Sequence, residues 1–138
     1  MSPGKATRRQ LQALLGRARF LSGYGMRLVS VNDECCTLAL PFRRAFERPG
    51  GTVNGPVFMA AADCAMWIAI KRRIGIEHDA VTSELNTAFL NAARRETVYC
   101  TARVLKMGKR MIFGTAECHD GKGHLFTHHT ATYARLLG

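Results

Sequence analysis

The first third of the chain carries one helical pattern followed by one strand-like stretch. Over residues 6–22 apolar side chains recur at spacings of three and four residues, which predicts a helix. They are Leu11, Leu14, Leu15, Ala18 and Leu21. Gly23 and Gly25 end this pattern. Residues 26–42 are rich in strand-forming side chains but are interrupted at 32–34, so they predict one long strand or two short ones.

The most apolar segment follows a charged, glycine-containing loop at 43–53. Pro56 stands at its start, where proline favours the first turn of a helix, and an alanine-rich run follows. Three basic residues and then Gly75 suit the end of that helix. Because the helix is apolar on every side, we expect it to be buried. Its one charged residue before the basic end is Asp63.

Strand patterns fill the rest of the chain. Residues 81–89 alternate in the manner of a strand, and three further runs cover 97–107, 111–119 and 125–136. The break at 120–123 contains Asp-Gly, which is a strong hairpin signal. This order predicts an α+β fold, the hotdog fold, in which a curled antiparallel sheet of five to six strands covers a central buried helix.

Composition and length favour one ordinary globular domain. The chain has 138 residues, of which 47% are hydrophobic and 22% charged. No apolar run reaches the roughly 20 residues of a membrane span, and the first residues lack the apolar core of a secretory signal. We therefore expect a single cytoplasmic domain over 1–138, with residues 1–24 as an N-terminal helical extension.

The charge balance points to an anionic partner. Twenty Lys and Arg residues against ten Asp and Glu give a net charge of +10. Such a surface attracts nucleic acid, anionic lipid or a phosphorylated small molecule such as coenzyme A, and composition does not choose among them.

Sulfur and imidazole side chains do not form a recognisable metal or nucleophile motif. The five cysteines include no Cys-x-x-Cys pair, so reduced, buried thiols are the simplest interpretation. The Cys and His residues near the C-terminus have no zinc-site spacing, so we expect no metal. They are Cys118, His119, His124, His128 and His129. There is no Gly-x-Ser-x-Gly motif, and Cys64 has no neighbouring His, which argues against a Ser or Cys nucleophile.

Asp63 and Gly55 are the candidate catalytic residues of the central helix. A carboxylate on an apolar helix is either hydrogen-bonded at the helix edge or acts as a general base or nucleophile. Gly55, at the helix N-terminus, either caps the helix or offers its N–H to a developing negative charge. Eight residues of helix separate the two by about 12 Å, too far to reach one carbon atom. If both serve one reaction, they must come from two chains of a homodimer.

The segment Asn54-Gly55-Pro56, followed by Asp63 after six residues, resembles the His-Gly-Gly-x6-Asp motif of hotdog-fold acyl-CoA thioesterases of the phenylacetate-degradation type. Residues 80–90, Gly108-Lys109-Arg110 and the turn at 120–123 are similar to later parts of that family, so the resemblance covers roughly residues 25–136.

The resemblance implies a role for each matching residue. Asp63 takes the place of the catalytic acid, and Gly55 that of the glycine whose N–H polarises the thioester carbonyl. Asn54 replaces the family's histidine, and Pro56 replaces its second glycine, which removes one N–H. Thr82 matches a position where some members hold the attacking water.

The resemblance also implies a use for the basic turns. Coenzyme A carries a pyrophosphate and a 3′-phosphate, which basic side chains in or beside the turns between strands would contact; otherwise they form a solvated basic face. These side chains are Arg94, Arg95, Lys106, Lys109 and Arg110. Further candidates in the loop before the helix are Arg43, Arg44 and Arg48.

The function that the resemblance implies is hydrolysis of an acyl-CoA thioester, with coenzyme A as part of the substrate and no separate cofactor. The changes at Asn54 and Pro56 motivate a rival, a non-catalytic acyl-CoA-binding protein. A basic nucleic-acid-binding module is a second rival, and a hotdog dehydratase a third, although it needs a His–acid pair that the sequence does not identify. The assembly expected is a homodimer or a homotetramer.

Overall fold

A computed structural model describes residues 4–136 as two α-helices, two short 3₁₀ helices and eight strands. The N-terminal elements are α1 (Arg8–Arg17), η1 (Arg19–Leu21), β1 (Arg27–Val31), β2 (Cys35–Leu40), η2 (Arg44–Phe46), β3 (Glu47–Arg48) and β4 (Thr52–Val53). The central helix is α2 (Gly55–Ile74). The remaining strands are β5 (Ala80–Phe89), β6 (Val98–Met107), β7 (Met111–His119) and β8 (Leu125–Arg135).

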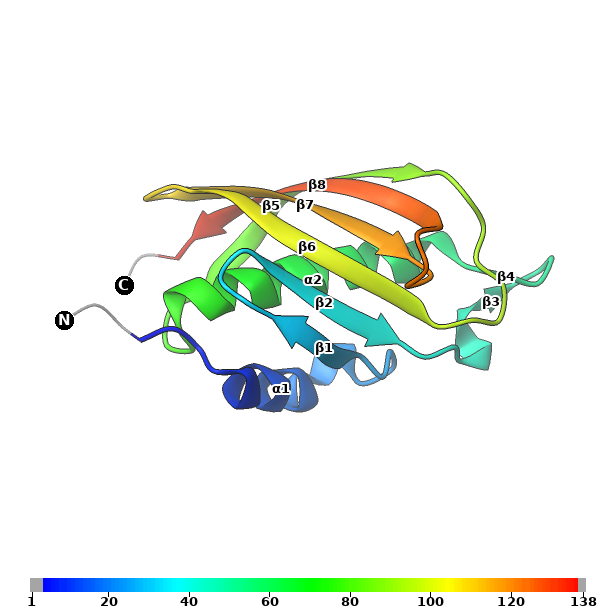
Figure 1. Cartoon of the computed structure of the whole chain (residues 1–138), viewed down its shortest axis with the longest axis horizontal. Helices are drawn as coiled ribbons and strands as arrows, with labels where there is room; N and C mark the ends of the chain where they lie inside the picture. The colour runs from blue at the N-terminus through cyan, green and yellow to red at the C-terminus, as the bar shows by residue number, and fades with distance from the viewer. Residues whose placement is uncertain (1–3, 137–138) are drawn as a thin grey trace.

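Six strands form one sheet that wraps α2. Their order is β1-β2-β6-β7-β8-β5, and every neighbouring pair is antiparallel. The sheet curls over the helix, while α1 lies beside β1 outside this wrap (Figure 1). This is the hotdog fold, as the sequence predicts.

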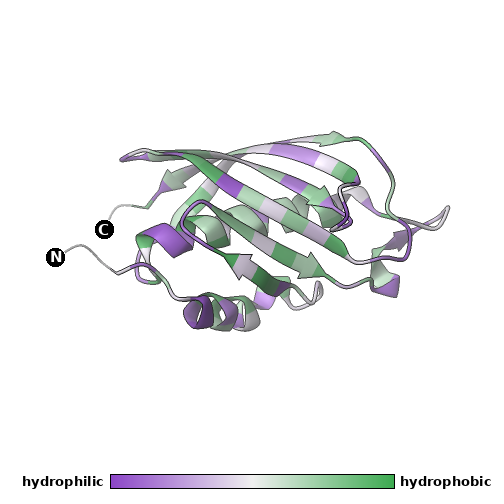
Figure 2. Ribbon diagram, in the orientation of Figure 1, coloured by the Kyte–Doolittle hydropathy of each residue, from purple (hydrophilic) through white to green (hydrophobic). Residues whose placement is uncertain are grey.

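The central helix is buried for most of its length. Twelve of its 20 residues are buried, and many of them are alanines, which let the sheet approach closely. The hydropathy colouring shows α2 as mainly hydrophobic, with hydrophilic residues at its C-terminal end (Figure 2). One apolar core joins residues of α1, α2 and all six strands of the sheet.

Both ends of α2 are capped: the C-terminal cap is Gly75, as the sequence indicates, but the N-cap is Asn54, and Gly55 is the first helical residue rather than the cap. The Asn54 side chain accepts a hydrogen bond from the Val57 N–H at 3.1 Å and donates one to the Phe46 carbonyl at 2.9 Å. At the other end Gly75 adopts a φ of 90°, a left-handed conformation that glycine reaches without strain.

Two local predictions need correction. The N-terminal helix is shorter than residues 6–22, because Ala18 takes an extended conformation and separates α1 from η1. The segment 43–53 is not a simple loop, since it contains η2 and the small β3–β4 hairpin.

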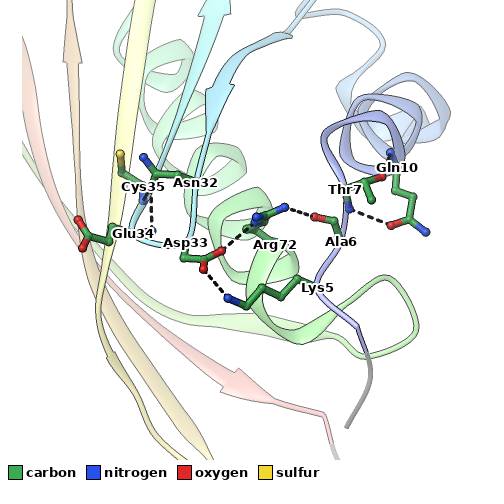
Figure 3. A network of polar contacts seen from close by, with 9 residues as sticks. All are labelled: Lys5, Ala6, Thr7, Gln10, Asn32, Asp33, Glu34, Cys35 and Arg72. Carbon is green, nitrogen blue, oxygen red and sulfur yellow. Dashed lines mark hydrogen bonds and ion pairs between the residues drawn. The ribbon is translucent and has the colours of Figure 1, made fainter. Parts of the chain in front are cut away.

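A polar network joins the N-terminal segment to the core of the fold (Figure 3). Arg72 of α2 donates from its Nη1 atom to the Ala6 carbonyl at 2.8 Å and from its Nε atom to Asp33 at 3.1 Å. Asp33 also pairs with Lys5. In the same turn the Asn32 side chain accepts from the backbone N–H groups of Glu34 and Cys35, which is why 32–34 separates β1 from β2.

Candidate active site

Asp63 lies in the middle of α2, at the point where the helix faces the beginning of β5. The Thr82 hydroxyl donates a hydrogen bond of 2.7 Å to its Oδ1 atom. The carboxylate is half-buried, so it is neither isolated in the core nor free in solvent. This geometry leaves the second carboxylate oxygen available to a ligand or a water molecule.

Tyr133 is a second donor to the same carboxylate, and sequence analysis missed it. Its hydroxyl donates to Asp63 Oδ1 and lies 2.7 Å from the Asp63 carbonyl oxygen. Burial raises the pKa of the Tyr133 phenol, and the neighbouring Asp63 carboxylate raises it further. The phenol therefore remains protonated at neutral pH and acts as a donor.

The register of the sheet brings Thr82 and Tyr133 together. They are directly opposite each other in the antiparallel pairing of β5 with β8. Directly opposite residues point to the same side of a sheet, here the side that covers α2. Two hydroxyl groups from neighbouring strands thus hold one carboxylate on the helix.

A pocket of about 470 Å³ opens beside this carboxylate. Asp63, Thr82 and Tyr133 are among its lining residues, and most of the surface of the pocket is apolar. Trp67 of α2 contributes one wall, and Phe20 from η1 contributes another. An apolar pocket with a few convergent polar groups is the usual form of a small-molecule site.

Gly55 lies at the N-terminal end of α2 and does not line this pocket. It lines a second hollow of about 290 Å³ together with Phe58 and Phe89. Pro56 has no N–H, and the Val57 N–H donates to Asn54, so the Gly55 N–H is the donor of the first turn that remains for a ligand. Within one chain, Gly55 and Asp63 therefore belong to two separate hollows.

Comparison with known proteins identifies the fold's family. The family model of the thioesterase superfamily matches residues 50–127, a stretch that contains Gly55, Asp63 and Thr82. The chain belongs to the thioesterase superfamily. The finer resemblance to the phenylacetate-degradation type remains a prediction.

Individual relatives of this superfamily member are distant in sequence but close in shape. A protein of Saccharolobus solfataricus that carries an esterase name is 25% identical over 100 residues, which are 72% of this chain and 71% of that protein. The structure of a conserved protein from Pseudomonas aeruginosa superimposes with a TM-score of 0.82 at 27% identity, over 86% of this chain and 94% of that one. A thioesterase from Haemophilus influenzae superimposes with a TM-score of 0.87 at 18% identity, over 99% and 95% of the two chains, and this likeness concerns the fold alone.

Four of the basic residues predicted to contact coenzyme A lie in turns between strands and fall into two groups in this thioesterase-superfamily fold. Of the others, Lys106 lies on β6, Arg44 in η2 and Arg48 on β3, and Arg43 donates to the Gly23 carbonyl at 3.1 Å. Arg94 and Arg95 lie in the β5–β6 connection, where Arg95 forms an ion pair with Glu47 at 2.7 Å. Lys109 and Arg110 lie in the β6–β7 turn, at the opposite end of β6. A strand of ten residues spans about 33 Å, so one chain presents these two groups far apart.

The thiols and imidazoles form no metal cluster in the part of the chain that is described. Between residues 4 and 136, no group of His, Cys, Asp and Glu side chains is arranged to hold a metal ion. Burial raises the pKa of the Cys64 thiol well above its usual value, and Cys36 and Asp63 add to the shift. Cys64 is therefore a neutral thiol beside the pocket and a poor nucleophile. No helix of residues 4–136 is long and apolar enough to cross a membrane.

Proposed function

We propose that this chain is an acyl-CoA thioesterase, which hydrolyses a thioester to a free acid and coenzyme A. The observation that carries the proposal is the Asp63 carboxylate, which accepts hydrogen bonds from Thr82 and Tyr133 in the lining of a pocket and lies on an otherwise apolar helix. A half-buried carboxylate with one oxygen fixed by two donors is suited to general-base catalysis through its other oxygen.

In the proposed reaction, Asp63 removes a proton from a water molecule as that water attacks the thioester carbonyl carbon. The Thr82 hydroxyl donates to Asp63, so its oxygen remains free to accept a hydrogen bond from the same water. The tetrahedral intermediate then expels the coenzyme A thiolate, which takes up the proton from Asp63. The reaction consumes water and the thioester and needs no other cofactor. Direct attack by Asp63, which expels the thiolate and forms a mixed anhydride with the acyl group, is the alternative. After turnover in ¹⁸O-labelled water, ¹⁸O in the Asp63 side chain supports direct attack, because water has then hydrolysed the anhydride at the Asp63 carbonyl carbon.

The tetrahedral intermediate carries an oxyanion, which needs a hydrogen-bond donor. We assign this role to the Gly55 N–H of a second chain, at the positive end of its α2. Asn54 holds the first turn of that helix through its hydrogen bonds to Phe46 and Val57. The proposed active site is thus shared between the chains of a homodimer.

The exposed edge of β5 supports this arrangement. β5 is an outer strand of the sheet, and apolar side chains at its two ends, Val81 and Phe89, are 47% and 57% exposed. Thr82, near one end, contacts Asp63, while the Phe89 ring, at the other end, lies about 3.2 Å from where a Cβ atom on Gly55 would be. In the proposed dimer, two β5 edges pair antiparallel in the register that sets Thr82 of one chain opposite the partner's Phe89. The same pairing brings Asp63 of one chain towards the partner's Gly55.

The basic turns complete the proposal by binding the phosphates of coenzyme A. In the proposed dimer, the β5–β6 connection of one chain and the β6–β7 turn of its partner come to the same end of the joined sheet. Arg94 and Arg95 from one chain and Lys109 and Arg110 from the other then face one nucleotide. Arginine is well suited to this role because its planar guanidinium binds phosphate through two parallel hydrogen bonds.

The proposed function is tested with Asp63→Asn, which keeps the shape of the side chain and removes the base. Against a panel of acyl-CoA thioesters, we expect kcat to fall by about two orders of magnitude or more. Glu117→Gln is the matched control, because Glu117 is an exposed acid on β7 whose side chain pairs with His128. We expect the control to keep wild-type kcat. An Asp63→Asn protein that retains most of the activity contradicts the mechanism, whereas binding of acyl-CoA without turnover in the wild type supports the non-catalytic alternative.

A further inference from the structure

We propose that η1 forms the acyl-binding wall of the Asp63 pocket and that Phe20 is the residue that selects the acyl group. The inference rests on the proposed function, because it places the thioester at Asp63. It assigns the ligand to a chemical class, namely acyl groups with an apolar tail long enough to extend about 6 Å beyond the thioester, which is the distance along α2 from Asp63 to Trp67.

The pocket extends from Asp63 along α2 to Trp67. These residues are four positions apart and therefore lie on the same face of the helix, about 6 Å apart along its axis. Both line the pocket, together with Phe20 and Leu21 of η1. A two-carbon acyl group at Asp63 would not reach Trp67, whereas a chain of about six carbons would.

Trp67 of α2 faces the acyl site beside η1, and its ring is fixed by hydrogen bonds. Its indole Nε1 donates to Asp79 Oδ1 at 3.1 Å, and the same oxygen accepts from the Ala80 N–H at 2.8 Å. These bonds anchor the ring between α2 and the start of β5. An acyl group thus meets a preformed aromatic surface.

Phe20 of η1 lines the same pocket but is mostly exposed to solvent. Its ring packs on Trp67, with ring centroids 5.9 Å apart and planes inclined at 55°, yet 71% of the residue is exposed. The adjoining Leu21 is buried and fixes η1 in place. A phenylalanine that is held at the rim of a pocket and is mostly uncovered has apolar surface that a ligand can bury.

The polar groups of the pocket favour an uncharged tail. Asp63 and Asp79 both line the pocket. Asp79 already accepts hydrogen bonds from Trp67 and Ala80, and it pairs with Lys71 at 3.6 Å. A tail with its own carboxylate would be repelled by Asp63, whereas the charge of Asp79 is offset by its ion pair with Lys71. A polar tail would lose water against the aromatic rings without a new hydrogen bond. An apolar tail incurs neither cost.

The kinetic test compares hexanoyl-CoA with acetyl-CoA in Phe20→Ala. We expect kcat/KM for hexanoyl-CoA to fall about tenfold, because the tail loses one wall, and kcat/KM for acetyl-CoA to change less than twofold. Phe113→Ala is the matched control, since Phe113 is also an exposed phenylalanine but lies on β7 and is not part of the pocket. It should change neither value. An equal loss for both substrates, or none for hexanoyl-CoA, overturns the inference.

A binding measurement keeps this inference separate from catalysis. Trp67 is the sole tryptophan, so its fluorescence reports directly on the pocket. Hexanoyl-CoA added to Asp63→Asn should shift the emission, and acetyl-CoA should shift it less. In the double variant that also carries Phe20→Ala, hexanoyl-CoA should bind about tenfold more weakly.

If the emission responds in this way but the wild type hydrolyses nothing, the proposed function fails and the acyl site stands. If the wild type hydrolyses hexanoyl-CoA but the emission does not respond, the acyl site fails. Loss of oligomeric state in Phe20→Ala, measured by light scattering, also overturns it, because Phe20 would then be an interface residue.

Discussion

At the scale of single residues, the site depends on how the hydroxyl groups of two side chains, Thr82 and Tyr133, donate to one carboxylate, that of Asp63. Asp63 stands out in the sequence because it is the one acid on an apolar helix, and Thr82 follows from the family resemblance. Tyr133 has no such signal, since a tyrosine in a strand is usually part of the core. Its role becomes visible only when the phenol is seen to donate to Asp63.

We predict that Tyr133→Phe lowers kcat about tenfold while KM stays within twofold. The substitution removes one hydrogen bond to a charged group, which orients Asp63 but does not itself contact the substrate. Tyr24→Phe is the control, because Tyr24 also lines the pocket but its hydroxyl makes no hydrogen bond within residues 4–136. Steady-state kinetics of both variants on one acyl-CoA check the prediction. A rise in KM with unchanged kcat would mean that Tyr133 binds substrate instead of positioning the base.

At the scale of elements, the parts of the fold that have strong local signals are predicted best. Residues 111–119 match β7 at both ends, and Gly75 ends α2 as expected. The break at Ala18 and the β3–β4 hairpin were missed. Both are short and lack periodicity, and their conformation depends on packing against the rest of the chain rather than on local propensity.

The assembly of the site could be predicted only in part for the same reason. Strand alternation predicts that β5 and β8 exist, but not that Thr82 pairs with Tyr133, which is 51 residues away in the sequence. The order β1-β2-β6-β7-β8-β5 places the chain's last described strand between two earlier ones. Such a long-range pairing follows from how the sheet closes over α2, which no local pattern encodes.

The close packing of the sheet on α2 gives a prediction about stability. A Cβ atom at Gly114 of β7 would lie 2.2 Å from both the Arg103 carbonyl oxygen and Met66 Cε. We predict that Gly114→Ala destabilises the protein by about 1–3 kcal/mol, because either the backbone of β6 at Arg103 or the Met66 side chain of α2 must move away from the new methyl group. Gly16→Ala is the control, since nothing lies within 4 Å of its Cβ position on α1, and it should stabilise slightly. Urea unfolding of the two variants measures both changes, and a neutral Gly114→Ala would show that the sheet can move away from α2.

At the scale of the whole molecule, the net charge of +10 and the position of the basic turns bear on substrate binding. If these turns hold the coenzyme A phosphates, the KM for an acyl-CoA should rise about threefold or more between 50 and 500 mM salt, with little change in kcat. The same acyl group on N-acetylcysteamine, which has no phosphate, should show a higher KM and weak salt dependence.

The double variant Lys109→Ala with Arg110→Ala should raise the KM for acyl-CoA, and Arg17→Ala on α1 is the control for loss of charge. Equal KM values for the two substrates would assign the basic turns another role, and the nucleic-acid alternative would gain support.

The shared site makes a prediction that only an oligomer can satisfy. Asp63→Asn removes the base, and Gly55→Pro removes the N–H that we assign to the oxyanion, so each variant alone should be inactive. Mixed in equal amounts, unfolded and refolded together, half of the dimers should contain one chain of each kind. In such a dimer, one of the two sites combines the intact Asp63 of the glycine variant with the intact Gly55 of the aspartate variant, and the other site lacks both. The mixture should therefore recover about a quarter of wild-type kcat per chain. If Gly55 and Asp63 instead served one site within a single chain, every site in the mixture would lack one of them and no activity would return.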